Sequence, residues 1–174
     1  YYFDFDDVKP ADHGTNLISL HVDSNDAYAC LIPHSIDDQE NVIVDPETDV
    51  GDGPNIGHFS GYGELSDELE FFLWEDNGDG AYQLSEQILA GPGTVIDQIQ
   101  TEMIALQLTG GGPTAYIGLA WCAGDQSLSL SNVLCDGNGM GNIAQTDKLL
   151  ASLTAYAVQV RNNPNFLCKN VVLP

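Results

Sequence analysis

Residues 63–87 read GELSDELEFFLWEDNGDGAYQLSEQ, and this stretch decides the predicted fold. Its first half contains an apolar and aromatic run, Leu69 to Trp74, which has the length of one strand. A short continuous apolar run of this kind is typical of a buried strand. From Glu75 onward, carboxylates, amides and glycines follow one another at close spacing. The stretch therefore predicts a central buried strand that leads into a polar loop at one end of a sheet.

The polar loop has the spacing of a twelve-residue calcium loop. With the first ligand at residue 75, the predicted oxygen ligands are Glu75, Asn77, Asp79, the Ala81 carbonyl, Gln83 and Glu86. Gly80 stands where such a loop turns sharply. Asp is the usual first ligand, so Asp76 is the alternative to Glu75. The other interpretation is a solvated hairpin loop that needs no ion. We favour calcium because the pattern continues beyond the turn to Glu86.

Composition places the chain among acidic proteins that fold as one domain. The 174 residues are 43% hydrophobic, and 26 Asp and Glu stand against 4 Lys and Arg, for a net charge of −22. Nucleic acid and anionic membranes are poor partners, because binding phosphate requires clustered cations. Such acidity suits divalent cations or high salt outside the cell, although it also serves solubility alone. No apolar run approaches the roughly 18 residues of a membrane span.

Four cysteines, Cys30, Cys122, Cys135 and Cys168, are widely spaced and form no C-x-x-C pair. This spacing argues against a zinc or thioredoxin-type site and favours two disulfides in an extracellular protein. Three pairings are possible. We favour the local pair Cys122 with Cys135, which leaves Cys30 to pair with Cys168. Free buried thiols are the alternative.

Most of the remaining chain has strand patterns. Residues 16–22 alternate, residues 23–26 have turn chemistry, and 27–32 form a second strand, so we expect a hairpin. Residues 33–62 contain too little apolar surface for a core and are predicted to be a long surface excursion. Gly91-Pro92-Gly93 is expected to break the chain, and 94–108 fits a helix as well as two strands.

Two strong strands close the sequence. Residues 115–122 form a continuous apolar run. Residues 149–161 form a long strand with one face made by Leu149, Ala151, Leu153, Ala155 and Ala157. Many short strands without a βαβ rhythm predict an all-β sandwich, a single domain over residues 1–174, with long end loops and one or two short helices.

No catalytic constellation is visible. The four histidines, His13, His21, His34 and His58, do not form H-E-x-x-H, the pattern of a zinc protease. No Ser or Cys has a nucleophile elbow, and Gly110 to Pro113 lacks the Lys of a phosphate loop. We therefore expect no enzymatic activity and no small-molecule substrate.

Six blocks of the sequence, in order, resemble the camelysin/TasA family of secreted surface proteins: FDFDDVKPADHG, ISLHVDSNDAY, GELSDELEFFLWEDNGDGAY, YIGLAWC, GNIAQTD and YAVQVRNNPNF. The resemblance covers most of the chain. It implies a jelly-roll β-sandwich, export from the cell, and self-assembly into fibres or pili in which a segment near the N-terminus of one subunit completes the sheet of another. A camelysin-type metalloprotease is the first alternative, and a monomeric surface adhesin is the second.

The N-terminus departs from the family pattern. Members carry a strand-forming segment upstream of the F-x-D-V-K-P block, whereas this sequence begins almost on the block. Three expectations follow: the fragment lacks its donor strand, a shortened donor is present, or the protein does not polymerise in this way. The candidate assembly residues are Tyr1, Tyr2, Phe3, Asp4 and Phe5.

Overall fold

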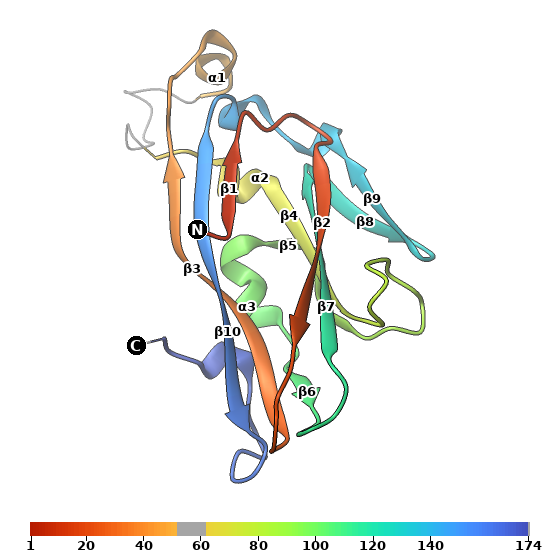
Figure 1. Ribbon diagram of the computed structural model, residues 1–174. Coiled ribbons are helices and arrows are strands. Elements are labelled where there is room, and N and C mark those ends of the chain that lie inside the picture. Colours follow the sequence, from red (N-terminus) through yellow and green to blue (C-terminus); the bar gives the residue numbers. More distant parts are fainter. Residues whose placement is uncertain (52–61, 174) are drawn as a thin grey trace.

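The computed structural model describes residues 1–51 and 62–173, and it contains two four-stranded antiparallel sheets that pack face to face (Figure 1). The first sheet has the order β1 (Phe3–Asp6), β10 (Lys148–Gln159), β3 (Ala27–Gln39) and β6 (Leu106–Leu108). The second has the order β2 (His13–Leu20), β7 (Ala115–Ala123), β4 (Leu69–Asp76) and β5 (Ile88–Val95). The predicted all-β sandwich is confirmed, and this strand order is that of a jelly roll.

The continuous apolar run of β4 is explained by burial on both faces. Leu69, Phe71 and Leu73 point into the core between the two sheets. Phe72 and Trp74 point to the other face, where they form a second cluster with Tyr82 and Ala120. This outer cluster is covered by partly buried side chains of the separate hairpin β8 (Asp125–Ser129) and β9 (Asn132–Asp136), which the sequence patterns did not predict.

The predicted hairpin between residues 16–22 and 27–32 is wrong. β2 pairs with β7, and β3 pairs with β10 and β6, so the two strands belong to different sheets. Residues 21–26 carry the chain across the sandwich instead. This arrangement buries the apolar face of each strand against the opposite sheet, which a two-stranded hairpin by itself cannot do.

The expected break at Gly91-Pro92-Gly93 is also wrong. β5 continues through this segment with a cis peptide bond between Gly91 and Pro92. β5 is the outer strand of its sheet, and an edge position tolerates Pro because no ladder hydrogen bond is lost on the free side. A Cβ atom on Gly91 would collide with the carbonyl oxygen of Phe71, which explains the glycine.

The predicted excursion over 33–62 is partly structured. β3 runs on to Gln39, and α1 (Asp45–Val50) follows with Glu47 fully buried. Residues 52–61 of the excursion lie outside the described residues. Two further short helices are α2 (Leu65–Glu68) and α3 (Ile99–Glu102), and the ambiguous 94–108 segment becomes the end of β5, a 3-10 turn, α3 and β6.

Both favoured disulfides are confirmed. Cys122–Cys135 joins β7 to β9, and Cys30–Cys168 joins β3 to the C-terminal segment. That segment is also held by Gln100, whose side-chain amide donates to the carbonyl oxygens of Cys168 at 3.1 Å and Val171 at 2.7 Å. Among the described residues, the helices are all too short or too polar to cross a membrane.

Candidate functional site

The N-terminal strand β1 is docked into its own sandwich. It pairs with the first part of β10, from Asp6 opposite Lys148 to Phe3 opposite Ala151. Phe3 is 3% exposed, and its ring lies 5.4 Å from that of Phe71 on the opposite sheet. The ammonium group of Lys148 lies 2.8 Å from a carboxylate oxygen of Asp4 and 3.6 Å from one of Asp6.

β1 is much shorter than β10, which leaves part of β10 without a neighbour on one side. Within the described chain, residues 152–159 of β10 pair only with β3. We call the other side of residues 152–159 the open edge. The Ala151 carbonyl accepts from the Tyr2 N–H at 2.9 Å, so the backbone groups of Ala151 face the side where β1 lies. Backbone groups of alternate strand residues face the same side, so those of Leu153, Ala155 and Ala157 face the open edge.

The inner face of β10 becomes exposed along the open edge beyond Leu153, which still packs partly against the core. Leu149 and Ala151, next to β1, are fully buried. Ala155 and Ala157 point to the same face, yet both are exposed. Since no strand of the described chain pairs with β10 at the open edge, the sandwich is left one strand short here.

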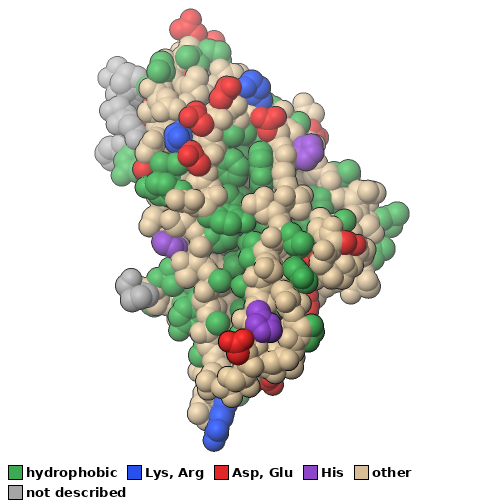
Figure 2. All heavy atoms as spheres, in the orientation of Figure 1, with side chains coloured by type: hydrophobic (Ala, Val, Ile, Leu, Met, Phe, Trp, Pro, Cys, Tyr) green, Lys and Arg blue, Asp and Glu red, His purple; other side chains and the backbone are tan. Residues whose placement is uncertain are grey.

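The facing strand, β2, is also an edge. Its eight residues pair with β7, and no strand of the described residues pairs with its other side. Ile18, Leu20 and the following Val22 pack only partly against the core. Figure 2 shows hydrophobic side chains along the middle of this face, between the positions of β10 and β2 in Figure 1. At its lower end a pocket of about 340 Å³ lies between residues 21–25 and the end of β10.

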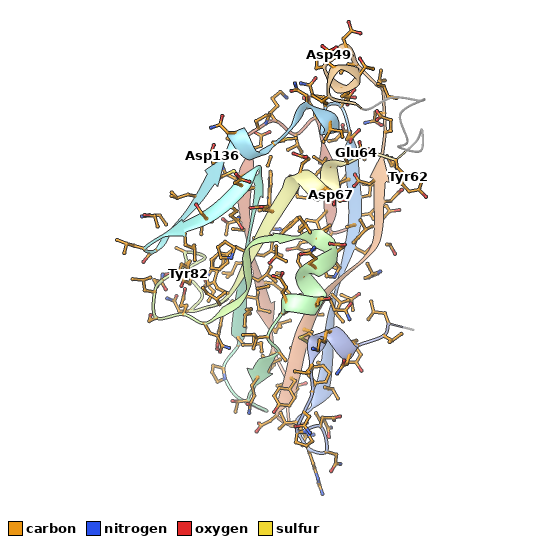
Figure 3. The ribbon with its side chains drawn as sticks, turned by 180° about the vertical axis from the view of Figure 1, so that it is seen from behind. Asp49, Tyr62, Glu64, Asp67, Tyr82 and Asp136 are labelled. Carbon is orange, nitrogen blue, oxygen red and sulfur yellow. A yellow bond between two sulfur atoms is a disulfide. The ribbon has the colours of Figure 1, made fainter. Side chains whose placement is uncertain are left out.

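The predicted calcium loop connects β4 to β5 and is folded on itself. Asp76 is 5% exposed and accepts from the Trp74 indole N–H at 2.9 Å and from the backbone N–H groups of Gly78 at 2.6 Å and Gly80 at 3.1 Å. Gly78 and Gly80 have φ values of 105° and 75°, which favour glycine. Tyr82, labelled in Figure 3, anchors the loop by its edge-to-face contact with Phe72 at 5.1 Å.

The other predicted ligands also interact within the loop. A carboxylate oxygen of Glu86 accepts from the Asn77 N–H at 2.9 Å, and its second oxygen accepts from the Gln83 N–H at 2.8 Å. Asp79 accepts from the Ala81 N–H at 2.9 Å, which lowers the pKa of Asp79, with the Gln83 and Asn77 contacts acting in the same direction. Glu75 is the last but one residue of β4. The carboxylate that accepts from the loop backbone is that of Asp76, the alternative first ligand, rather than that of Glu75. Calcium binding to these residues stays a prediction.

A second acidic group was missed by sequence reasoning. Glu40, Glu47 and Asp147 can each place one carboxylate oxygen within 4.8 Å of the others, and Glu47 and Asp147 are almost fully buried. Glu47 accepts from the Val44 N–H, and Asp147 accepts from the Glu64 N–H at 2.6 Å. No signal in the sequence unites these residues, because β3, α1 and the approach to β10 meet only in the fold. Carboxylates can hold a divalent cation, but an acidic cluster by itself does not establish one.

Burial also affects Asp38 at this end of the sandwich, where Figure 3 shows Asp49, Glu64 and Asp67. Burial raises the pKa of Asp38, and the nearby Asp67 charge adds to this effect. The Ser66 N–H donates to Asp38 at 2.9 Å and acts in the opposite direction.

The histidines do not converge on one site in the described chain. His13 begins β2 and His21 follows its end, so the eight-residue extended span separates them by about 26 Å. His34 contacts Ser35 and Thr154, at 3.1 Å and 2.9 Å. His58 lies outside the described residues. His13 and His21 therefore cannot share one metal ion.

Comparison with known proteins adds no identification: no family model matches the chain, and no curated protein matches it.

Proposed function

We propose that the protein is a non-catalytic structural subunit of an extracellular filament, pilus or biofilm matrix, which joins copies of itself by strand addition. The observation that carries the proposal is the open edge of β10, residues 152–159, opposite the free edge of β2. An extended segment from a second copy can pair with the free backbone groups and cover the exposed Ala155 and Ala157. The resemblance of the six sequence blocks to the camelysin/TasA family supports the same function.

The other two edges of the sandwich are poorly suited to this pairing. β6 has only three residues. β5 contains Pro92 and positive-φ glycines at 91 and 93, and its register with β4 shifts twice. Short strands, Pro and irregular pairing are the features by which natural sheets prevent edge-to-edge association. Strand addition is therefore favoured on the side of the sandwich formed by β10 and β2.

The donor segment stays a prediction. Tyr1 to Phe5 was the candidate, and within a single subunit Phe3, Asp4 and Phe5 pair with β10 of the same chain. If two copies exchanged their β1 strands, the same contacts would form between the copies. Each exchanged strand would keep its register with β10 and its ion pairs with Lys148. A segment upstream of Tyr1 in the complete protein is the other candidate donor.

The covalent structure is compatible with an extracellular protein. Two disulfides are typical of oxidising compartments, and the net charge of −22 suits a salt-rich surrounding. Calcium at residues 75–86 would stabilise the end of the β4–β5 connection, and we include it in the proposal as a structural ion.

The test is electron microscopy and sedimentation of the complete mature protein at native salt with calcium. We expect fibres with a regular subunit repeat. Ala155→Glu places a charge on the inner face at the open edge and should abolish the fibres. The matched control Ser152→Glu lies on the same strand but points to the outer face, so it should assemble.

Both variants should retain the melting temperature of the parent within a few degrees, which separates assembly from folding. Protein that stays monomeric with its full native N-terminus would refute the proposal, as would fibres that form equally well with Ala155→Glu. Proteolysis abolished by a chelator would instead favour the metalloprotease alternative.

A further inference from the structure

The C-terminal segment forms an asparagine-rich pocket against the outer face of β10. The pocket has a volume of about 400 Å³, within the roughly 300–1,000 Å³ range of ligand pockets. Its principal side chains are two aromatic rings and four amides: Tyr156, Phe166, Asn162, Asn163, Asn165 and Asn170. No Asp or Glu lines it, in a chain with 26 of them.

The amides are available for a ligand. Among the described residues, the side chains of Asn162, Asn165 and Asn170 have no hydrogen-bond partner, whereas the Asn163 amide donates to the Gln159 carbonyl at 2.8 Å. Each free amide offers both a donor and an acceptor. A donor and an acceptor on one side chain suit neighbouring sugar hydroxyls, because each hydroxyl can both donate and accept a hydrogen bond.

The aromatic rings give the pocket an apolar surface. Phe166 is stacked nearly parallel to Tyr156, with an interplanar angle of 13° and centroids 6.3 Å apart, and to Tyr28 at 12° and 5.8 Å. Flat aromatic surface beside amides matches a pyranose ring, which presents C–H groups on its faces and hydroxyls at its edges.

The pocket is held in place before any ligand binds. The Cys30–Cys168 disulfide fixes the segment to β3, and the Gln100 side chain holds the Cys168 and Val171 carbonyls. Two backbone hydrogen bonds shape the loop that follows β10. The Asn163 N–H donates to the Val160 carbonyl at 3.0 Å, and the Phe166 N–H donates to the Asn163 carbonyl at 3.2 Å. Such preorganisation reduces the entropy cost of binding.

Two of the four cationic side chains flank the pocket in sequence. Arg161 precedes Asn162, and Lys169 precedes Asn170. Neither is in an ion pair among the described residues, whereas Lys9 and Lys148 both pair with Asp. Neither cation lines the pocket itself, but in so acidic a chain two unpaired cations next to its residues in sequence favour an anionic ligand.

We propose that this pocket binds an acidic saccharide, with the asparagine amides on its hydroxyls, Tyr156 and Phe166 beside its ring, and Arg161 and Lys169 toward its carboxylates. Tyr156 lies on the outer face of β10, whereas Ala155 and Ala157 at the open edge face inward. Subunits joined at the open edge would therefore still present the pocket, and repeated sites would increase avidity for a polysaccharide. The binding step itself does not depend on assembly.

The test is an NMR titration of the monomeric chain with trigalacturonate, with maltotriose as the neutral trisaccharide and acetate as the carboxylate control. We expect saturating shifts in residues 156–170 with a Kd at or below about 1 mM for trigalacturonate, and at least tenfold weaker binding of maltotriose. Asn165→Ala with Asn170→Ala should weaken binding at least tenfold. Arg161→Gln and Lys169→Gln should each weaken it about threefold at low salt and less at high salt.

Matched controls are Asn132→Ala, at the turn of the β8–β9 hairpin, and Lys9→Gln, which should leave the affinity unchanged. All six positions are exposed, so the variants should fold. The proposal is overturned if trigalacturonate gives no saturating shift, if acetate reproduces the shifts, if maltotriose binds equally well, or if the asparagine variants bind like the parent. None of these outcomes bears on whether the protein forms filaments.

Discussion

Trp74 of β4 lies directly over Gly118 of β7, its register partner in the neighbouring strand. The indole is 1% exposed, and a Cβ atom on Gly118 would lie 2.7 Å from its Cδ2 atom and closer still to two other ring atoms. The glycine is therefore required for this ring position, which supports the outer cluster under the β4–β5 loop.

Gly118→Ala should destabilise the protein by about 1–3 kcal/mol, because the indole has to move within a packed cluster. Urea denaturation followed by tryptophan fluorescence measures the change. Ala120→Gly on the same strand is the comparison, since it removes a methyl group from the same cluster without forcing the indole to shift. A Gly118→Ala variant as stable as the parent would mean that the ring has another position open to it.

Phe3→Ala should cost about 3–5 kcal/mol, since it removes a buried ring that contacts Phe71 and leaves a cavity where β1 is docked. Tyr1→Ala is the control, because Tyr1 is 73% exposed and surface substitutions change stability by about 0.5 kcal/mol or less. Thermal unfolding of the two variants gives the comparison. Equal melting temperatures would show that β1 contributes little to the monomer.

Replacing the pair Cys30 and Cys168 by Ala should reduce stability more than replacing Cys122 and Cys135. The pairs are 138 and 13 residues apart, and the chain-entropy model gives about 5 and about 3 kcal/mol for loops of these lengths. Guanidinium denaturation measures both. Limited proteolysis adds a local readout, because the C-terminal segment should be cleaved first when Cys30–Cys168 is absent. The opposite ranking would indicate that this segment opens independently of the sandwich.

Calcium should raise the melting temperature if residues 75–86 bind it. A site with a Kd of about 1 mM, within the range of extracellular modules, would add about 1.4 kcal/mol in 10 mM calcium. Asp79→Asn with Glu86→Gln should remove the gain, while Asp23→Asn, another exposed carboxylate, should retain it. Calorimetric titration without heat, together with no effect of a chelator, would leave the segment as a hairpin loop that needs no ion.

Asp38→Asn should stabilise the protein at neutral pH relative to the parent. The folded-state pKa of Asp38 is raised by burial, so ionisation costs folding free energy above that pKa. As the pH falls through the raised pKa and then below the ordinary value of 3.8, the parent regains this energy and the difference disappears. Denaturation of both proteins between pH 7 and pH 3.5 measures it. A difference that grows toward acid pH would contradict the burial argument.

Local patterns predicted much of the secondary structure. The apolar run at 69–74, the alternation after Asn16 and the long run from Leu149 each became strands, and both favoured disulfides formed. The errors arose where tertiary context overrides local preference. Gly91-Pro92 continues a strand because β5 is an edge, and the turn after β2 crosses between sheets because each apolar face packs on the opposite sheet.

The candidate sites show the same division. The loop at 75–86 was visible because its residues are adjacent in sequence. The cluster of Glu40, Glu47 and Asp147 was not, because its residues come from segments far apart. The asparagine-rich pocket lies within residues 156–172, but it forms only where the chain after β10 folds back against that strand. The number of cysteines limited the covalent links to three pairings, and only the fold shows which surfaces those links hold together.

The sequence by itself determined an acidic, disulfide-linked β-sandwich built around the strand that begins at Leu69. Apolar run length, alternation and composition specify that much, since they act along neighbouring residues. Only the tertiary structure decided which edges remain open. β1 covers four residues of a twelve-residue strand, and the resulting unpaired backbone of β10 depends on pairings between segments more than a hundred residues apart.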